Sequence, residues 1–175
     1  MTVVSAPFRP VPSCRGFTMV ELIVVLILIG ILGALGAARF FDKGTFDAAA
    51  FSSRAAAALR FAQKEAIAQN RPVTAFLDAA GINLCFANIS PCPAGQQVAA
   101  PFSVGTGSYC TSSTWYCISR PTAVNYSATV ASITFDALGR PSAGGAVMGA
   151  VATLTITEGS ASNLITVEPE TGYVH

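Results

Sequence analysis

The feature that most constrains this chain is a long apolar run, residues 17–38, which carries a single charged side chain, Glu21. As a helix rising about 1.5 Å per residue, the run is roughly 33 Å long, enough to cross a bilayer core of about 30 Å. A secretory signal peptide has an apolar region of only about 7–15 residues, which ends at a cleavage site of small residues. We therefore expect residues 17–39 to form a transmembrane helix rather than a signal peptide.

Glu21 lies near the start of this run, where a carboxylate is costly. Insertion scales give roughly 2.5–3.5 kcal/mol for a charged side chain at the centre of a membrane helix, and less near the interface. In one interpretation, Glu21 lies among the lipid headgroups or is stabilised by the helix macrodipole. In the other it has a function, because ionisable residues within membrane segments usually do. The second interpretation requires a compensating charge.

The residues around Glu21 favour the second interpretation. Gly16-Phe-Thr-Met-Val-Glu21, which opens the apolar helix, resembles the type IV prepilin signature. The resemblance implies that a prepilin peptidase cleaves between Gly16 and Phe17 and methylates the new Phe17 amine. It also implies that Glu21 pairs with the N-terminal amine of a neighbouring subunit as a filament grows. Two charges that are costly alone in lipid are tolerated as a pair.

The charges on either side of the apolar run indicate how it is oriented in the membrane. The predicted leader, residues 1–16, contains Arg9 and Arg15, which the positive-inside rule would hold in the cytoplasm. Arg39 and Lys43 on the far side make this asymmetry weak by itself. The expected location is the inner membrane, with a single span and a periplasmic C-terminal domain, and then a pilus or pseudopilus. The expected partners are the prepilin peptidase, other pilin or pseudopilin subunits and the inner membrane.

The overall charge gives no indication of a nucleic-acid partner. Of ten Lys and Arg residues, eight remain after Arg9 and Arg15 are removed, against nine Asp and Glu. This balance lacks the basic excess typical of a nucleic-acid-binding domain, so no nucleic acid is expected. One helical face carries three basic residues, Arg54, Arg60 and Lys64. Such a face could contact DNA phosphates, but a basic helical face is more commonly exposed to solvent, which is the interpretation that we favour.

The cysteines indicate disulfide bonds. Cys14 departs with the leader and leaves an even set of four, Cys85, Cys92, Cys110 and Cys117. In a domain exported to an oxidising compartment, four cysteines are typical of two disulfides, with three possible connectivities. Six residues separate the members of each neighbouring pair, which favours Cys85–Cys92 and Cys110–Cys117. A zinc site is the alternative, although structural zinc usually has two to four residues between paired ligands.

After the apolar run, residues 40–70 are predicted to form an amphipathic helical half. Apolar residues recur there at every third or fourth position: Phe51, Ala55, Ala58, Leu59, Ala62, Ala66 and Ile67. Residues 42–44 interrupt the two helical stretches, so we predict one long helix with Gly44 as the place for a bend. The helix should end near Asn70, because Pro72 disfavours helix at Arg71.

Residues 71–175 are predicted to form a β-rich domain, which makes the fold class α+β. Pro- and Gly-rich loops are expected at 88–108 and 142–149. Strands are expected at 73–77, 83–87, 109–118, 132–135, 152–157 and 164–168. Short turns between most of these strands argue for a meandering antiparallel sheet.

Three motifs in this half resemble the soluble domain of GspH/FimT-type minor pilins and pseudopilins. They are SSRAAAALRFAQKEAIAQNRPV at 52–73, ITFDALGRP at 133–141 and LITVEPETGYV at 164–174. The pattern RFFD, FDAAAF and ALRFAQK within 39–64 also looks like the MshC branch, a minor pilin of mannose-sensitive haemagglutinin-type (MSHA-type) pili. The resemblance implies a pilin-like fold, a long N-terminal helix packed on an antiparallel sheet, and a structural role in a filament.

The sequence leaves three alternatives to an MSHA-type minor pilin. One is a pseudopilin of type II secretion, which the sequence does not separate from it. A second is a DNA-binding, FimT-like minor pilin in DNA uptake, but TGYVH at the C-terminus offers no cluster of arginines. The third is a membrane-anchored periplasmic enzyme, for which no catalytic motif is present. We expect no catalytic site, no cofactor and no metal.

Two possible roles remain for His175 and for three aromatic residues. His175, the single histidine, is expected to lie in a disordered tail rather than to act as a ligand. Tyr109, Trp115 and Tyr116 lie within or beside a cysteine-bounded loop. They could form an exposed patch for a partner, because aromatic residues are enriched at interface cores, or they could belong to the sheet core, which we favour.

Overall fold

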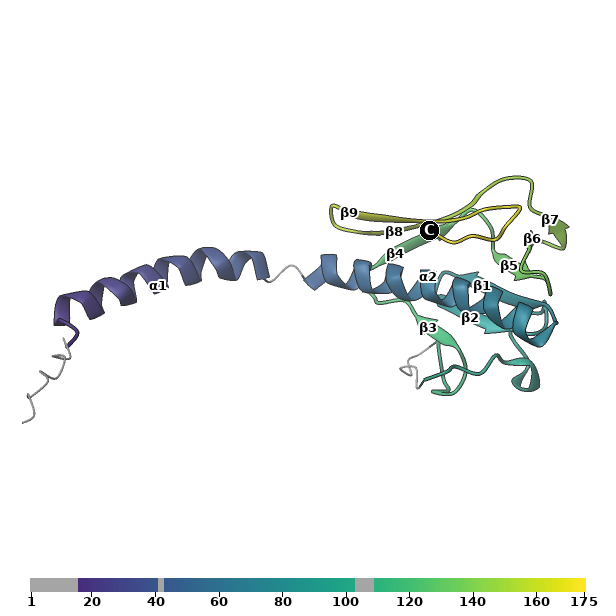
Figure 1. The fold of residues 1–175 in the computed structure, drawn as a ribbon, viewed down its shortest axis with the longest axis horizontal. Coiled ribbons are helices and arrows are strands. Elements are labelled where there is room, and N and C mark those ends of the chain that lie inside the picture. The colour runs from purple at the N-terminus through teal and green to yellow at the C-terminus, as the bar shows by residue number, and fades with distance from the viewer. Residues whose placement is uncertain (1–15, 41–42, 103–108) are drawn as a thin grey trace, which may run out of the picture. The chain divides into compact units, whose positions relative to one another are not determined.

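The computed structural model describes residues 16–40, 43–102 and 109–175, without the side chains of residues 34–40 and 43–45. The predictions for the leader residues 1–15, for Asp42 and for loop residues 103–108 lie outside the described residues. The chain divides into two compact units, Met1–Asp42 and Lys43–His175 (Figure 1).

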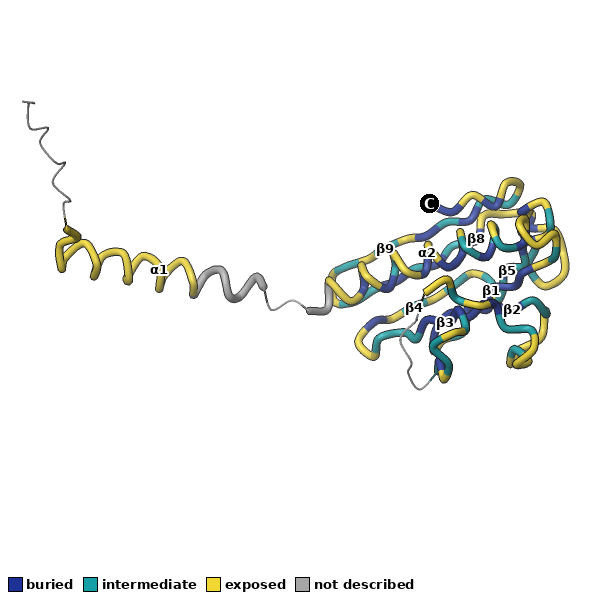
Figure 2. The backbone as a smooth tube through the Cα atoms, turned by 60° about the horizontal axis from the view of Figure 1, so that its bottom comes forward, coloured by how far each residue is buried: buried dark blue, intermediate teal, exposed yellow. Residues whose placement is uncertain are grey.

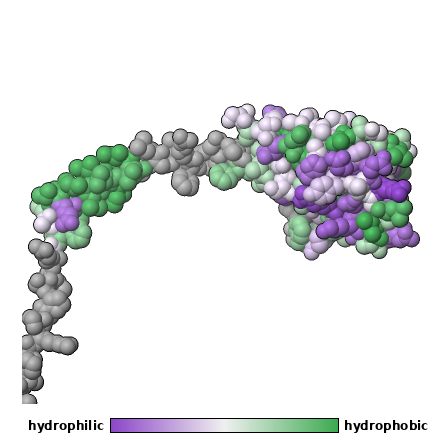
Figure 3. All heavy atoms as spheres, turned by 45° about the horizontal axis from the view of Figure 1, so that its top comes forward, coloured by the Kyte–Doolittle hydropathy of each residue, from purple (hydrophilic) through white to green (hydrophobic). Residues whose placement is uncertain are grey.

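The first unit contains helix α1, Met19–Phe40. Its described side chains are exposed and mostly apolar, and Figure 3 shows this hydrophobic surface. Among the helices in the described part of the chain, none has both the length and the apolar character that crossing a membrane requires. The transmembrane helix expected at 17–39 stays a prediction.

The second unit combines one long helix with short strands. Helix α2 covers Lys43–Gln69. The described residues after α2 form nine strands: β1 Val73–Asp78, β2 Gly81–Cys85, β3 Cys117–Ser119, β4 Asn125–Ala128, β5 Ser132–Phe135, β6 Pro141–Ala143, β7 Ala146–Val147, β8 Ala152–Glu158 and β9 Ala161–Val167. A short 3-10 helix, Ala94–Gln96, lies between β2 and β3.

The strands form two sheets rather than one meander. The larger sheet has the order β3-β2-β1-β5-β6-β7, the smaller has the order β4-β8-β9, and neighbouring strands are antiparallel throughout. The expectation of one sheet is wrong because β4 pairs forward with β8 instead of with its neighbours in sequence. The α+β class, with a helix followed by antiparallel sheets, is confirmed.

Helix α2 packs against both sheets. It contacts β1, β2 and β5 of the larger sheet, and β8 and β9 of the smaller one. Figure 2 shows α2 with one buried and one exposed side. Its buried positions follow helical spacing: Ala48, Phe51, Ala55, Ala58, Leu59, Ala62 and Ala66. This agrees with the predicted apolar face except at Ile67, which is 50% exposed although it lies close to the turn at Gly139.

The ends of α2 differ slightly from those expected. Instead of one long helix, the structure has two, α1 ending at Phe40 and α2 beginning at Lys43. Gly44 lies within α2, and residues 41–42 are outside the described residues. The helix ends at Gln69, one residue before the expected end, and Asn70 takes a left-handed conformation with φ 50°. The amide of Arg71 then donates to the Ala66 carbonyl at 3.1 Å, which satisfies one of the last free carbonyl groups of the helix.

Several strand positions also differ. Asp78 pairs with Gly81, so the first hairpin turns within two residues and β2 begins before the expected residue 83. Of the strand expected at 109–118, only Cys117 and Ile118 become part of β3. Strand β4 does not appear among the predicted strands, although its short sequence alternates, with Tyr126 and Ala128 partly buried against the core and Asn125 and Ser127 exposed. Strands β6 and β7 fall in the expected loop 142–149 because they form a small hairpin around Gly144 and Gly145.

The C-terminal tail is held in place, contrary to the expectation of disorder. His175 and Thr166 exchange two backbone hydrogen bonds, at 2.7 and 3.0 Å. The guanidinium of Arg60 on α2 donates to the Val174 carbonyl at 3.1 and 3.2 Å. The tail therefore covers the outer edge of β9, and it lies beside the smaller sheet in Figure 1.

Gln63 ties α2 to two distant turns. Its Nε2 atom donates to the carbonyls of Gly139 at 3.0 Å and Thr171 at 2.8 Å. Gly172 fits tightly here, since a Cβ atom on it would lie 2.5 Å from the Gly139 carbonyl oxygen and 3.1 Å from the Phe135 ring. Its φ of +66° also disfavours a side chain.

We expect Gly172→Ala to lower the free energy of unfolding by about 3 kcal/mol. This sum combines about 1–2 kcal/mol for a left-handed non-glycine residue with overpacking of about 1–3 kcal/mol. Gly159→Ala is the matched control, because Gly159 has a φ of +56° but open space around it, so its loss should be about 1 kcal/mol. Denaturant unfolding followed by the fluorescence of Trp115, the single tryptophan, measures both. Equal losses would contradict the tight packing.

Candidate functional site

The N-terminal candidate residues lie at the start of α1. Gly16 is exposed and Phe17 is 75% exposed, so the bond between them is accessible. The Glu21 amide donates to Thr18 Oγ1 at 3.2 Å, and the Leu22 amide donates to the Thr18 carbonyl at 3.2 Å. Thr18 is therefore the N-cap of α1, which places Glu21 in the first helical turn.

The first-turn position of Glu21 has two consequences. Its carboxylate is exposed on a helix whose neighbouring side chains, including Val20 and Leu22, are apolar and exposed. The macrodipole favours an acidic group at this end of a helix, which agrees with the first interpretation of Glu21. The Thr18 hydroxyl satisfies the backbone amide of Glu21, and the Glu21 side chain is exposed.

The four candidate cysteines form two disulfides. Cys85 is joined to Cys92, with Cα atoms 5.9 Å apart, and Cys110 to Cys117, with Cα atoms 5.6 Å apart. Paired in this way, the sulfur atoms do not act as zinc ligands. Among the described residues, no group of three or more His, Cys, Asp or Glu side chains is placed to hold a metal ion.

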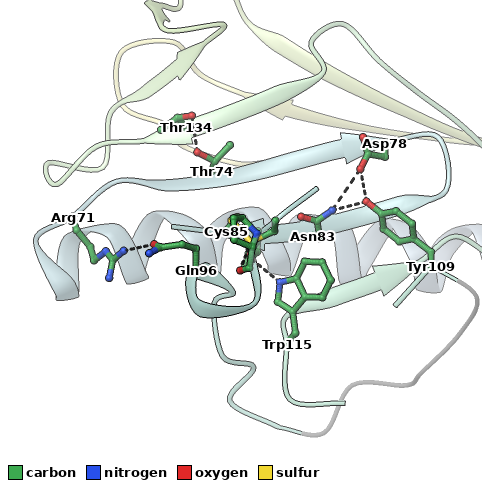
Figure 4. Close-up of a disulfide and its surroundings, with 12 residues drawn as sticks. Arg71, Thr74, Asp78, Asn83, Cys85, Gln96, Tyr109, Trp115 and Thr134 are labelled. Carbon is green, nitrogen blue, oxygen red and sulfur yellow. Dashed lines mark hydrogen bonds between the residues drawn. A yellow bond between two sulfur atoms is a disulfide. The ribbon is translucent and has the colours of Figure 1, made fainter. Parts of the chain in front are cut away.

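The first disulfide closes a loop that is also held by side chains from outside it (Figure 4). The Arg71 guanidinium donates to Gln96 Oε1 at 3.1 Å and lies 3.8 Å from the centre of the Phe86 ring. Trp115 Nε1 donates to the Leu84 carbonyl at 2.8 Å, next to Cys85. Cys85 lies in β2 and Cys117 in β3, so each disulfide joins its loop to a strand of the larger sheet, and Trp115 adds a bond from the second loop to β2.

The aromatic residues of the second loop belong mainly to the core. Tyr116 is 4% exposed and stacks on Phe61 of α2, with ring centres 4.8 Å apart. Trp115 and Tyr109 are half-buried and hydrogen-bonded. The favoured alternative, sheet core, thus holds for Tyr116, and neither of the other two forms an open patch.

Tyr109 closes a small polar cluster under β2. Its hydroxyl donates to Asp78 Oδ2 and accepts from Asn83 Nδ2 (Figure 4). Burial, together with the hydrogen bond to Asp78, raises the pKa of Tyr109 well above its usual value, so the phenol stays protonated and remains a donor. Burial likewise raises the pKa of Tyr126. These groups are suited to holding the sheet together and not to proton transfer near neutral pH.

Asp136 has a structural role in a turn of the second unit. Asp136 Oδ1 accepts hydrogen bonds from the amides of Leu138 and Arg140, both at 2.8 Å, and so shapes the turn before β6. In the described part of the chain, the acidic side chains are not gathered into a group that could hold a metal ion.

The structure does bring together a groove that the sequence did not predict. It consists of two adjoining cavities of about 310 and 70 Å³ that share Ala57, Phe102 and Tyr116. We call it the α2 groove. Its other lining residues are Arg54, Arg60, Phe61, Lys64, Pro101 and Ile118. The three basic residues placed on one helical face by the sequence therefore line this groove together.

Comparisons with known proteins match two regions of the chain. A family model described as the prokaryotic N-terminal methylation motif matches residues 12–37. A second, described as type II transport protein GspH, matches residues 52–171, which is more than half of the chain. No curated protein matches.

Two solved structures are similar to the chain, both of the type IV minor pilin FimU from Pseudomonas aeruginosa strain PAO1. In one crystal form the identity is 14% and the TM-score 0.48, covering 72% of this chain and 89% of FimU. In the other the identity is 16% and the TM-score 0.45, covering 77% and 87%.

The methylation motif spans Gly16, Phe17 and Glu21, and the second match spans α2 beyond Phe51 and most of both sheets. The chain therefore belongs to the GspH family of type IV pilin-like proteins and carries the prokaryotic N-terminal methylation motif at its start.

Proposed function

We propose that this chain is a minor subunit of a type IV pilus-like filament, with a structural and assembly role rather than a catalytic one. The observation that carries the proposal is the position of Glu21, an acid in the first turn of an apolar helix directly after the Gly16–Phe17 bond. The methylation motif that matches residues 12–37 supports the same role.

In the proposed assembly, a prepilin peptidase cleaves after Gly16 and methylates the Phe17 amine. The new amine carries a positive charge only four residues before Glu21. Within a filament, the amine of one subunit meets the Glu21 carboxylate of another, so neither charge stays unpaired in an apolar environment. The exposure of the Glu21 side chain supports this pairing, because a neighbouring subunit can reach it.

The proposed location follows from the same helix. The precursor is held in the inner membrane by residues 17–39 as a single span, and residues 71–175 lie in the periplasm until assembly. Two disulfides in the second unit suit an oxidising compartment.

Two kinds of filament fit the proposal. The MshC-like pattern within residues 39–64 favours an MSHA-type pilus, whereas the family description favours a type II secretion pseudopilus. Deleting the gene and measuring both surface piliation and protein secretion distinguishes the two. Loss of secretion with normal piliation would assign the pseudopilus, and the reverse would assign the pilus.

Cleavage is tested at Gly16. The peptidase needs a small residue before the cut, so Gly16→Leu should leave the precursor uncut, visible as a larger band on a gel. N-terminal sequencing of the wild-type protein should begin at methylated Phe17. Gly95 is an exposed glycine of the second unit, outside the methylation motif, so Gly95→Leu serves as the control and should be processed normally. Unchanged processing of Gly16→Leu would remove the proposed cut site.

The role of Glu21 is tested by its incorporation into filaments. Glu21→Ala should be cleaved normally, but its content in sheared filaments should fall at least about tenfold, because leaving one member of a buried ion pair alone costs about 3–5 kcal/mol. Glu170→Ala removes an exposed acid of the second unit and should assemble like the wild type. If Glu21→Ala filaments contain the normal amount of this subunit, the pairing does not occur.

The disulfide pairing in the exported protein is proposed to be Cys85–Cys92 and Cys110–Cys117. Proteolytic mapping by mass spectrometry under non-reducing conditions should find these two cross-links and no free thiol in the mature chain. Cross-links between the two pairs, such as Cys85 with Cys110, would overturn the pairing.

A further inference from the structure

The α2 groove combines a basic rim with an aromatic floor. We propose that it binds an acidic segment of a partner protein, with an aromatic side chain of that segment packed against the open face of Phe102 and its flanking carboxylates paired with the cations at the rim. The groove lies wholly within the second unit, so this binding can be measured whether or not the chain assembles into a filament.

The first argument is the concentration of charge. Three of the ten Lys and Arg residues of the chain line the groove, namely Arg54, Arg60 and Lys64, and none of the nine Asp and Glu residues does. The net charge of the whole chain is only +1. Charges of one sign gathered on a nearly neutral protein favour a partner surface of the opposite sign.

The second argument is the position of the three cations along the groove. Arg60 donates to the Val174 carbonyl and is thereby fixed at one side of the groove. Arg54 and Lys64 are exposed at the two ends. Ten positions apart on a helix, their Cα atoms are roughly 15 Å apart. An extended peptide covers that distance in about four or five residues, so two acids flanking one aromatic residue match the rim.

The third argument is the shape of the floor. Ala57, between the cations on α2, has a small side chain and leaves the centre open. Tyr116 stacks on Phe61 beneath it, and Phe102 meets Tyr116 edge to face with ring centres 6.1 Å apart. Phe102 is 61% exposed, which is costly for a large apolar side chain that stays uncovered. The larger cavity, about 310 Å³, is at the lower end for ligand pockets of about 300–1,000 Å³ and suits one aromatic side chain.

A protein segment suits these features better than a nucleic acid. Binding of single strands relies on open aromatic faces on which successive bases stack. In the α2 groove, the faces of Phe61 and Tyr116 are already stacked on each other, and Tyr116 is 4% exposed. Of the described rings that line the groove, only Phe102 offers an open one, which fits a single inserted side chain.

The test uses the full chain in detergent micelles and a synthetic, fluorescein-labelled peptide, acetyl-Glu-Asp-Gly-Phe-Gly-Asp-Glu-amide. Fluorescence anisotropy should show saturable binding that weakens as salt is raised. The charge-reversed peptide, with lysine in place of each acid, should not bind, and replacement of the phenylalanine by alanine should weaken binding about tenfold or more.

Variants of the chain locate the site. Arg54→Glu with Lys64→Glu should weaken binding at least about tenfold, and the milder pair Arg54→Gln with Lys64→Gln should do so without introducing repulsion. Ala57→Trp should block binding by filling the floor. Arg140→Glu changes an exposed cation outside the groove and should bind like the wild type. Thermal unfolding of each variant verifies the fold.

Three outcomes would overturn the proposal: no saturable binding, equal binding of the charge-reversed peptide, or folded groove variants that bind like the wild type. Displacement of the peptide by a single-stranded oligonucleotide at a lower concentration than unlabelled peptide would assign the groove to nucleic acid instead. Because Glu21→Ala leaves the groove intact, peptide binding by that variant separates a failure of this proposal from a failure of filament assembly.

Discussion

The second unit depends on the close packing of α2 against two sheets that do not pair with each other. The buried face of the helix is mostly alanine, and Ala55, Ala58 and Ala62 are fully buried. Small side chains let the helix backbone approach the strands closely, whereas larger ones would push the sheets away. Phe51 and Leu59 supply the bulk that fills the remaining space. The helix is thus the common support of both sheets, and displacing it would uncover both.

The same packing fixes the rotation of α2 about its axis, and with it the residues that lie on the outer face of the helix. Gln63 joins the helix to the turns at Gly139 and Thr171, and Arg60 joins it to the tail at Val174. These bonds are made by polar residues at the border of the buried face, so the helix has one fixed rotation relative to the sheets. With that rotation set, the three cations of the helix line the α2 groove together with Phe102 and with Tyr116, which lies in the loop closed by the second disulfide.

The first unit follows a different physical rule. The described side chains of its helix are exposed and apolar except for Glu21, and a carboxylate is not tolerated alone in an apolar surrounding. The hydroxyl of Thr18 caps the backbone at this end of the helix. In the filament proposed above, another subunit would supply both the apolar contact and the positive charge that such a helix requires.

The sequence by itself determined the N-terminal motif, the family, the α+β class and most of the buried face of α2, because each depends on residues close together in the chain with a strict spacing. It located strands β1, β5 and β8 for the same reason. Only the tertiary structure decided the split into two sheets, the ordered tail at His175 and the α2 groove. These depend on pairings between distant segments, such as Gln63 with Thr171, for which local patterns carry no signal. Strand β4 shows the limit most clearly, since it has only four residues and its partner, β8, begins 24 residues after it in the chain.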